Sequence, residues 1–480
     1  MTVLYITAEV SPFSKAGGLA DVSGALPAEL ARFGEHMIVI TPLYSLIDCQ
    51  QYGIYPTGIQ GEVLMGNTPR TYHIYESHYR KNSDHRIYFI ENDHYFRRSG
   101  IYTHPNGKGF EDNTERYFFF QLSIIDMLKR GVFHPQLIHC HDHHSALIPM
   151  MIHEMGYPAP ILYTIHNFDY RGYFSDSERS LLPEGISDII GQMESTGHST
   201  TSLALTYSDW VNTVSPTYAG ELLARADLSD ELHGKLNSIR QKFSGILNGA
   251  DDTYWNPMTD PHLTHHYSID DLSGKIKNKL KLQRTCELPV DAAAPVAGSI
   301  GRLVESKGYS LILASLEDLI REGMQFVFLG SGNETIAGEL TRLSQQYPAA
   351  LSFHQAIDEK LAHLIEAGSD MFIMPSEFEP CGLNQIYSMK YGTIPVVHRT
   401  GGLADTVTDW DGSFGTGFVF EPYSASAFLG TMRRALEVFT DPDTWYKIQM
   451  NAMSRDFSWK ASASVYQKLY HQLAGAGIHG

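Results

Sequence analysis

The chain has 480 residues, of which 43% are hydrophobic, so it is long enough for two α/β domains and too apolar to be disordered. Its formal net charge of −18 argues against nucleic acid or an anionic membrane as the main partner. Because no apolar run approaches ~18 residues and no basic leader precedes the first strand-like run, we expect neither a transmembrane helix nor a signal peptide. The four cysteines form no paired motif, which favours a reducing compartment, and we expect a cytoplasmic protein.

The first half of the chain alternates short apolar runs with helical stretches. Strands are predicted over Val3–Ala8, Met37–Thr41, Arg86–Glu91, Leu137–His141, Ile161–His166 and Trp210–Val214. Helices are predicted over Ala20–Phe33, Glu115–Arg130 and Ser145–Met155. Continuously apolar strands between helices are typical of a parallel sheet that is covered on both faces.

A polar stretch without clear periodicity, Asp251–Asp271, interrupts this pattern, and we place the domain boundary just before it, at Gly245–Gly249. The pattern restarts with strands predicted over Val296–Ile300, Gln325–Leu329, Leu351–His354, Met371–Met374 and Ile394–Val397. Helices are predicted over Ser310–Glu322, Lys360–Ala367, Leu383–Tyr391 and Ala425–Val438. The final segment, Trp459–Leu473, has apolar residues at helical spacing and could belong to either domain.

A similar heptapeptide occurs once in each half of the chain. The segment from Lys15 to Asp21, with Gly17 and Gly18 at its centre, has the same Gly-Gly-Leu-Ala-Asp core as the segment from Arg399 to Asp405. Each copy follows a predicted strand and precedes a helix-like stretch, so its glycines can let backbone N–H groups approach an anion at a helix N-terminus. Two copies favour a diphosphate held between two domains, although ordinary strand-to-helix turns are the alternative.

Two cations lie on one predicted loop after the strand Val296–Ile300. Arg302 and Lys307 are close enough in sequence to neutralise a diphosphate leaving group without a metal. A solvated loop with two surface cations is the alternative interpretation.

Glu379 precedes Pro380, Cys381, Gly382 and Leu383 at the predicted start of a helix. Its carboxylate can accept sugar hydroxyls, and the free N–H groups of residues 381–383 can donate to others. Good helix capping is the alternative explanation for a proline and a glutamate here.

Histidines gather at the ends of two predicted strands. His166 ends the strand Ile161–His166, where it can donate to a sugar hydroxyl or a developing oxyanion. The run His139-Cys-His-Asp-His-His144 looks like a metal site, but alternate residues of a strand point to opposite faces, so we expect no metal. Ligand contact by Asp142 is the better hypothesis, whereas Asn248 either contacts ligand or forms a turn.

Together these motifs resemble the bacterial glycogen synthase and plant starch synthase family over nearly the whole chain. The ordered set comprises Ser14–Leu19, His141-Asp142, Thr164–Asn167, Asn248–Asp251, Gly301–Leu303, Lys307-Gly308, Glu379–Leu383 and Thr400–Leu403. The resemblance implies an α/β fold with two Rossmann-like domains facing across a deep cleft, the glycosyltransferase-B architecture. It implies domains over residues 1–245 and 246–456, with a C-terminal helix in 457–480 that packs back on the N-terminal domain.

The resemblance also implies an activity. Glucose would pass from ADP-glucose to the non-reducing-end 4-hydroxyl of an α-1,4-glucan, with retention and without a metal or other cofactor. We favour front-face attack, with the leaving phosphate accepting the proton, over a double displacement through Glu379 or Asp142. A nucleotide-sugar epimerase or hydrolase on the same fold, and a non-catalytic glucan-binding relative, remain alternatives.

Roles for individual residues follow from the same resemblance. It implies that His166, Arg302, Lys307 and Glu379 act on the reacting glucose and the diphosphate. The expected substrate contacts are Lys15, Gly17, Gly18, Asp21, Tyr95, Asp142, Asn248, Cys381, Gly382, Leu383, Thr400, Gly401 and Gly402. Tyr387 stands where many retaining relatives have a second glutamate for the ribose, so the ribose contact stays unassigned.

Overall fold

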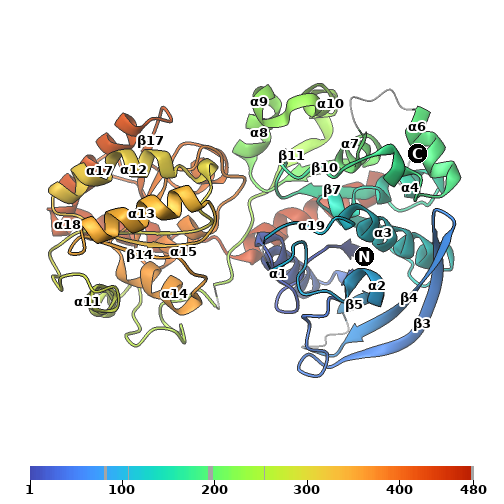
Figure 1. Ribbon diagram of the computed structural model, residues 1–480, viewed down its shortest axis with the longest axis horizontal. Coiled ribbons are helices and arrows are strands. Elements are labelled where there is room, and N and C mark those ends of the chain that lie inside the picture. Colours follow the sequence, from blue (N-terminus) through green and yellow to red (C-terminus); the bar gives the residue numbers. More distant parts are fainter. Residues whose placement is uncertain (80–83, 106, 193–197, 253, 477–480) are drawn as a thin grey trace. The chain divides into compact units, whose positions relative to one another are not determined.

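The computed structural model describes residues 1–79, 84–105, 107–192, 198–252 and 254–476. The chain divides into two compact units: unit 1 comprises Met1–Gly249 and Trp459–Gly480, and unit 2 comprises Ala250–Ser458. Each unit has its own sheet (Figure 1). No helix in the described part of the chain is long and apolar enough to cross a membrane.

Unit 1 is built on a nine-stranded sheet in the order β11-β10-β7-β6-β1-β2-β5-β4-β3. Its strands are β1 (Thr2–Ile6), β2 (His36–Pro42), β3 (Ile54–Met65), β4 (Thr68–Ser77), β5 (His85–Glu91), β6 (Leu137–His141), β7 (Ile161–Ile165), β10 (Trp210–Thr213) and β11 (Phe243–Gly245). The strands from β11 to β5 pair in parallel, and β3 and β4 add an antiparallel hairpin at one edge. Every residue of β6 and β7 is buried, as expected for strands covered on both faces.

Helices cover both faces of this sheet. The longer ones are α1 (Gly18–Arg32), α3 (Asn113–Lys129), α4 (Ile148–Glu154), α6 (Glu184–Gln192), α7 (Thr200–Tyr207), α8 (Pro216–Ala224) and α19 (Trp459–Ala476). Shorter elements are α2 (Asp93–Phe96), α5 (Asp176–Arg179), α9 (Ala226–Ser229), α10 (His233–Ser238), and the strand pair β8 (Tyr173–Phe174) and β9 (His198–Ser199).

Unit 2 has a six-stranded, fully parallel sheet in the order β14-β13-β12-β15-β16-β17. Its strands are β12 (Val296–Ile300), β13 (Gln325–Leu329), β14 (Leu351–His354), β15 (Met371–Met374), β16 (Ile394–His398) and β17 (Phe418–Phe420). Its helices are α11 (Ser273–Thr285), α12 (Tyr309–Arg321), α13 (Glu334–Gln346), α14 (Glu359–Gly368), α15 (Asn384–Lys390), α16 (Gly401–Thr406), α17 (Ala425–Phe439) and α18 (Pro442–Met453).

The C-terminal helix belongs to unit 1 although the chain passes through unit 2 before it. Helix α19 packs beside α1 and against β6, where Tyr466 and Tyr470 are fully buried (Figure 1). The division after Gly249, rather than after 245, has a physical reason. Ile246 donates its N–H to Thr213 O at 2.8 Å, and Leu247 O accepts from the Ser462 hydroxyl at 2.7 Å, so both remain with unit 1.

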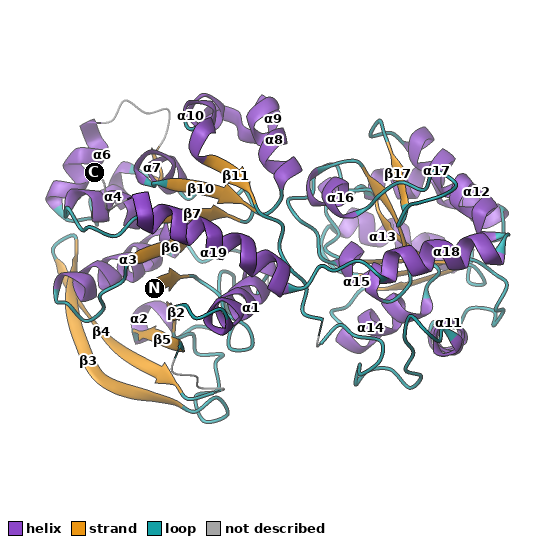
Figure 2. Ribbon diagram, turned by 180° about the vertical axis from the view of Figure 1, so that it is seen from behind, coloured by secondary structure: helices purple, strands orange, loops and turns teal. Residues whose placement is uncertain are grey.

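The structure differs from the predictions at several elements, among them β17, which was not among the predicted strands. The β3–β4 hairpin, seen as the two long strands at the sheet edge in Figure 2, was not among the predicted strands. Its outer faces are exposed and β3 contains a register shift between Pro56 and Gln60, so neither strand is continuously apolar. Helix α4 begins at Ile148, not at Ser145, because the Ser145 hydroxyl bonds back to His141 and holds a separate turn over His143–Ser145.

Candidate active site

In unit 2 the predicted cations and the predicted carboxylate meet at the topological switch point of the sheet. Strands β12, β13 and β14 extend to one side, whereas β15, β16 and β17 extend to the other. The loop after β12 carries Lys307 and the loop after β15 carries Glu379. Ligands of open α/β sheets bind at the carboxyl ends of strands at such a point.

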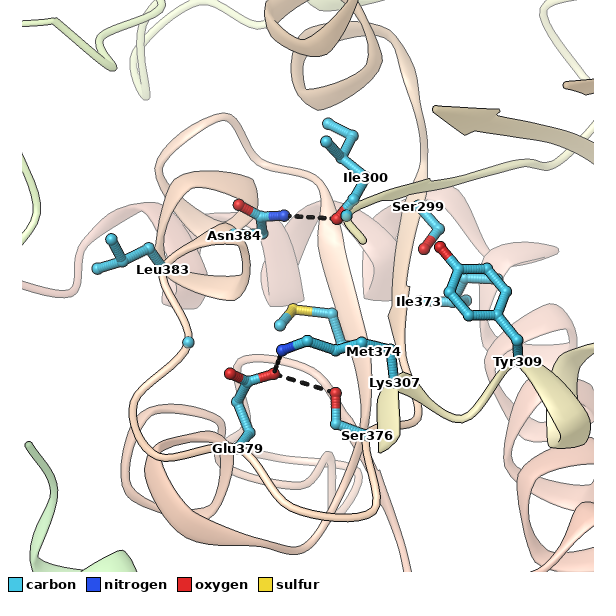
Figure 3. A pocket seen from close by; sticks show the side chains of 12 residues that line it. Ser299, Ile300, Lys307, Tyr309, Ile373, Met374, Ser376, Glu379, Leu383 and Asn384 are labelled. Atoms are coloured by element: carbon cyan, nitrogen blue, oxygen red, sulfur yellow. Dashed lines mark hydrogen bonds and ion pairs between the residues drawn. The ribbon is translucent and has the colours of Figure 1, made fainter. Parts of the chain in front are cut away.

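A pocket of about 140 Å³ lies between these two loops (Figure 3). Its lining comes from the end of β12, the start of α12, the end of β15 and the turn before α15. The lining residues are Ser299, Ile300, Gly301, Lys307, Tyr309, Ile373, Met374, Ser376, Glu379, Gly382, Leu383 and Asn384. Of the predicted residues, Lys307, Glu379, Gly382 and Leu383 are therefore brought together, whereas Cys381 is buried beside them and does not line the pocket.

An ion pair crosses the pocket (Figure 3). The Lys307 ammonium lies 2.5 Å from Glu379 Oε2, and the Ser376 hydroxyl donates to the same oxygen at 3.1 Å. Glu379 is buried, so the cation and the hydroxyl satisfy a charge that is costly to bury alone. A diphosphate entering the pocket would compete with Glu379 for Lys307, which would free that carboxylate for a sugar hydroxyl.

The second glycine turn supports this pocket from behind. Gly402 donates its N–H to Glu379 O at 3.0 Å, and Thr400, Gly401 and Gly402 are all buried. A Cβ on Gly401 would lie 2.0 Å from Glu379 O, and one on Gly402 would lie 2.0 Å from Cys381 O. Glycine is required here because the backbone that carries Glu379 packs directly on the turn.

Arg302 occupies a different environment from Lys307. Its side chain is exposed, and its guanidinium has no hydrogen-bond or ion-pair partner within the described ranges. It stands on the same loop after β12 but does not line the pocket. This guanidinium follows Gly301, which lines the pocket, and its geometry is suited to binding an anion.

In unit 1 the first glycine turn is open. Gly17 and Gly18 are exposed, and a Cβ added to either would meet no atom within 4 Å. Lys15 is exposed and pairs with Asp21 at 2.8 Å, which joins the two ends of the predicted motif.

A carboxylate that the sequence analysis did not single out already occupies part of this turn. Glu9, which is buried, accepts the N–H groups of Ala16 and Gly17 at 2.5 and 2.9 Å and the Tyr102 hydroxyl at 2.6 Å. Its position three residues beyond β1, at the end of a buried run, is the signal that would have found it. Tyr95 lies elsewhere: it is fully buried, and its hydroxyl donates to Glu115 at 2.5 Å.

Asp142 and His166 meet beyond the carboxyl ends of β6 and β7, of which β6 borders the switch point of the unit 1 sheet, between β1 and β6. Asp142 Oδ1 accepts the backbone N–H of His166 at 2.7 Å, and Asp142 itself has a left-handed φ of 53°. Burial raises the pKa of Asp142 to about 7 and lowers the pKa of His166 to about 3. His166 is therefore a neutral imidazole at neutral pH, suited to donating or accepting a hydrogen bond.

The four histidines of the run 139–144 form two separate pairs of ring contacts. The rings of His139 and His141 lie tilted against each other on one face of β6 with centroids 4.0 Å apart, whereas those of His143 and His144 contact each other beyond the strand. In the part of the chain that the structure describes, no three His, Cys, Asp or Glu side chains form a group that could hold a metal ion. Asn248 is also buried in unit 1, and its Oδ1 has no hydrogen-bond partner among the described residues.

Comparisons with known proteins agree with this geometry. Residues 2–238 match the family described as starch synthase catalytic domain, and residues 287–447 match glycosyl transferases group 1. A glycogen synthase of Syntrophotalea carbinolica is 38% identical over 484 residues, covering 98% of this chain and 99% of that protein. A glycogen synthase of Koribacter versatilis is 40% identical over 484 residues, covering 98% of both chains.

The chain belongs to the glycogen synthase family. The solved catalytic domain of starch synthase IV from Arabidopsis thaliana, bound to ADP and acarbose, is 33% identical and superimposes with a TM-score of 0.90 over 99% of each chain. Membership confirms the predicted fold class, the glycosyltransferase-B architecture, and makes the chain a glycosyltransferase of glycogen synthesis. A sucrose-phosphate synthase from Thermosynechococcus elongatus, at 17% identity and a TM-score of 0.60, shares the fold.

Proposed function

We propose that this glycosyltransferase moves glucose from ADP-glucose to the non-reducing-end 4-hydroxyl of an α-1,4-glucan, with retention of configuration. The observation that carries the proposal is the pocket of unit 2, in which Lys307 and Glu379 face each other at the switch point of the sheet. The Arabidopsis relative bound to ADP and acarbose supports a nucleotide and a glucan as ligands.

In the proposed reaction the site residues have different roles. Breaking the bond between glucose and phosphate leaves negative charge on the departing diphosphate and positive charge at the anomeric carbon. Arg302 and Lys307 would stabilise the leaving phosphate, each by roughly 2–4 kcal/mol in the transition state. Glu379, released from Lys307, would accept glucose hydroxyls, and His166 would contact the glucose near its reacting face.

We favour front-face attack because neither candidate carboxylate suits a nucleophile. Glu379 is engaged by Lys307 and Ser376, and Asp142 holds the His166 N–H with a pKa raised by burial to about 7. The leaving phosphate would then accept the proton of the attacking 4-hydroxyl, which needs no group from the protein. A trapped glucosyl-enzyme ester on either carboxylate would show double displacement instead.

The direct test uses purified protein and radiolabelled ADP-glucose, with and without glycogen. The proposal expects label in glycogen, and an α-anomeric configuration of the new linkage by proton NMR. Free labelled glucose in the presence of glycogen would favour a hydrolase, and a new sugar nucleotide would favour an epimerase. No turnover with ADP-glucose but retained binding to glycogen would favour a non-catalytic glucan-binding protein.

The proposal also expects that chelation leaves activity largely intact, because Arg302 and Lys307 provide the charge that a metal would otherwise supply. The measurement is transfer rate before and after EDTA treatment followed by gel filtration. Activity that disappears and returns only with Zn²⁺ or Mg²⁺ would contradict a metal-independent reaction.

A further inference from the structure

A second histidine lies directly behind His166 in unit 1. His141 is the last residue of β6, and its Nδ1 lies 3.0 Å from His166 Nε2. His141 is fully buried between the rings of Tyr5 and His139, whose centroids lie 4.1 and 4.0 Å from its own. Its ring is thus fixed by packing, and among the described residues only one of its nitrogens, Nδ1, has a hydrogen-bond partner.

The protonation state of this pair follows from burial. Burial lowers the pKa of His141 well below its ordinary value and that of His166 to about 3, so both rings are neutral at neutral pH. A neutral imidazole carries one N–H and one bare nitrogen. Between the two facing nitrogens, one must therefore donate and the other accept.

The unpartnered nitrogen of His141 decides which ring donates. His141 Nε2 is buried and has no hydrogen-bond partner among the described residues. If His166 Nε2 were the donor, His141 would carry its proton on Nε2 as an orphaned, buried N–H, which is rare in folded proteins. If His141 Nδ1 donates, the orphan is a bare nitrogen, and the proton of His166 is left on Nδ1.

We propose that His141 is a positioning residue that donates from Nδ1 to His166 Nε2 and so holds His166 in the Nδ1–H tautomer. His166 then offers its remaining ring nitrogen to the sugar as a hydrogen-bond donor. Asp142 fixes the backbone of His166 through its N–H, and His141 fixes its ring. The consequence for catalysis rests on the proposed function, whereas the tautomer itself does not.

Packing behind His141 reaches the C-terminal helix. The Thr164 hydroxyl donates to Asn212 Oδ1 at 2.5 Å, so Thr164 Oγ1 accepts from His139 Nε2 at 2.6 Å. His139 Nδ1 is then the acceptor for the Tyr470 hydroxyl of α19, at 2.7 Å. The ring that supports His141 is therefore held by a hydrogen bond on each side.

Two substitutions separate hydrogen bonding from packing at this position. His141→Phe keeps a ring between Tyr5 and His139 but removes the donor. His141→Asn loses the ring but places an amide N–H near the position of Nδ1. If His141 acted by packing alone, the asparagine variant would be the more damaged of the two. The proposal predicts the reverse order.

The experiment measures nitrogen protonation by NMR of ¹⁵N-histidine-labelled protein, with the His166 signals assigned by their loss in His166→Gln. In the unsubstituted protein, His166 Nε2 should be bare and Nδ1 protonated. His141→Phe should bring protonation of Nε2 and lower kcat about 10-fold with less change in KM. His141→Asn should keep the tautomer and most of kcat.

Two results would overturn the proposal. One is a protonated His166 Nε2 in the unsubstituted protein, and the other is a phenylalanine variant at least as active as the asparagine variant. Circular dichroism of both variants checks folding, and the spectrum of the unsubstituted protein decides the tautomer even if neither variant folds. Because the spectrum needs no substrate, failure of the ADP-glucose assay would leave this test valid.

Discussion

The Gly17–Gly18 turn of unit 1 and the Gly401–Gly402 turn of unit 2 share their sequence but differ in their surroundings. The first is exposed and has open space above both glycines. The second is buried under the backbone that carries Glu379. The same residues thus form an exposed turn in one unit and allow two backbone segments to pack closely in the other.

The cations of the two motifs differ in the same way. Lys15 pairs with Asp21 of its own motif at 2.8 Å, whereas Arg399 pairs with Glu421 at 3.4 Å, outside its motif. The cation that reaches the pocket of unit 2 is Lys307, from another loop. A repeated sequence therefore predicts a repeated turn, but its function in each unit depends on what packs against it.

The largest expected effect is at the cation of the unit 2 pocket. Lys307→Ala should lower kcat, because charge on the leaving phosphate would lose its cation. The expected loss of transition-state stabilisation is roughly 2–4 kcal/mol. Lys15→Ala should cost less, since its exposed charge is screened by water and salt. Steady-state kinetics with ADP-glucose and glycogen measure both.

Arg321→Ala is a matched control for these two variants, since Arg321 is an exposed, ion-paired cation at the far end of α12. It should leave turnover unchanged. Equal losses of kcat in Lys307→Ala and Arg321→Ala would contradict the assignment of Lys307 to the diphosphate.

The two glycine turns should also differ in how well they tolerate alanine. Gly402→Ala should lower the free energy of unfolding of unit 2 by about 1–3 kcal/mol, because its Cβ would collide with Cys381 O at 2.0 Å. It should also displace Glu379 and reduce kcat. Gly17→Ala should change stability by less than about 0.5 kcal/mol. Urea unfolding followed by fluorescence compares them, and similar losses in both variants would show that the turns are packed alike.

Much of this architecture could be predicted from the sequence, and the reason is burial. Strands such as β12, β13 and β15 are mostly apolar because both faces of the sheet are covered, and their predicted bounds match the structure. Lys307 and Glu379 could be placed near each other because the carboxyl ends of parallel strands meet at one edge. The β3–β4 hairpin could not be predicted in this way, because exposed positions break its apolar pattern.

The contacts that the sequence did not reveal depend on side-chain direction. Glu9 reaches back to Gly17, and Ser376 and Lys307 share one oxygen of Glu379, but no spacing in the chain encodes either arrangement. Tyr102, not Tyr95, contacts the carboxylate beside the first glycine turn. The two tyrosines are close in sequence, and only the fold separates the one in α2 from the one near Glu9.

A pH-dependent effect on stability is expected from the buried carboxylate of unit 1. The pKa of Asp142 rises from its ordinary 3.8 to about 7, so the folded chain holds this proton where the unfolded chain has lost it. Stability contributed by Asp142 should therefore be present below about pH 4 and be lost as the pH rises through about 7. In Asp142→Asn, the free energy of unfolding, measured with urea, should decrease less as the pH rises. An unchanged pH dependence would show that Asp142 is ionised throughout.

The most direct test of the difference between the two turns is amide hydrogen exchange with and without ADP, resolved on peptic fragments by mass spectrometry. We predict that residues 299–309 and 376–384, around the pocket, exchange more slowly when ADP binds. Residues 15–19 should do so as well, at amides other than those of Ala16 and Gly17, which already donate to Glu9. Residues 400–404 should exchange slowly in both states, because Gly402 already donates to Glu379 O and Leu403 and Ala404 already donate to Thr400 O. Fast exchange at 400–404 that slows only with ADP, together with no change at 15–19, would contradict the account.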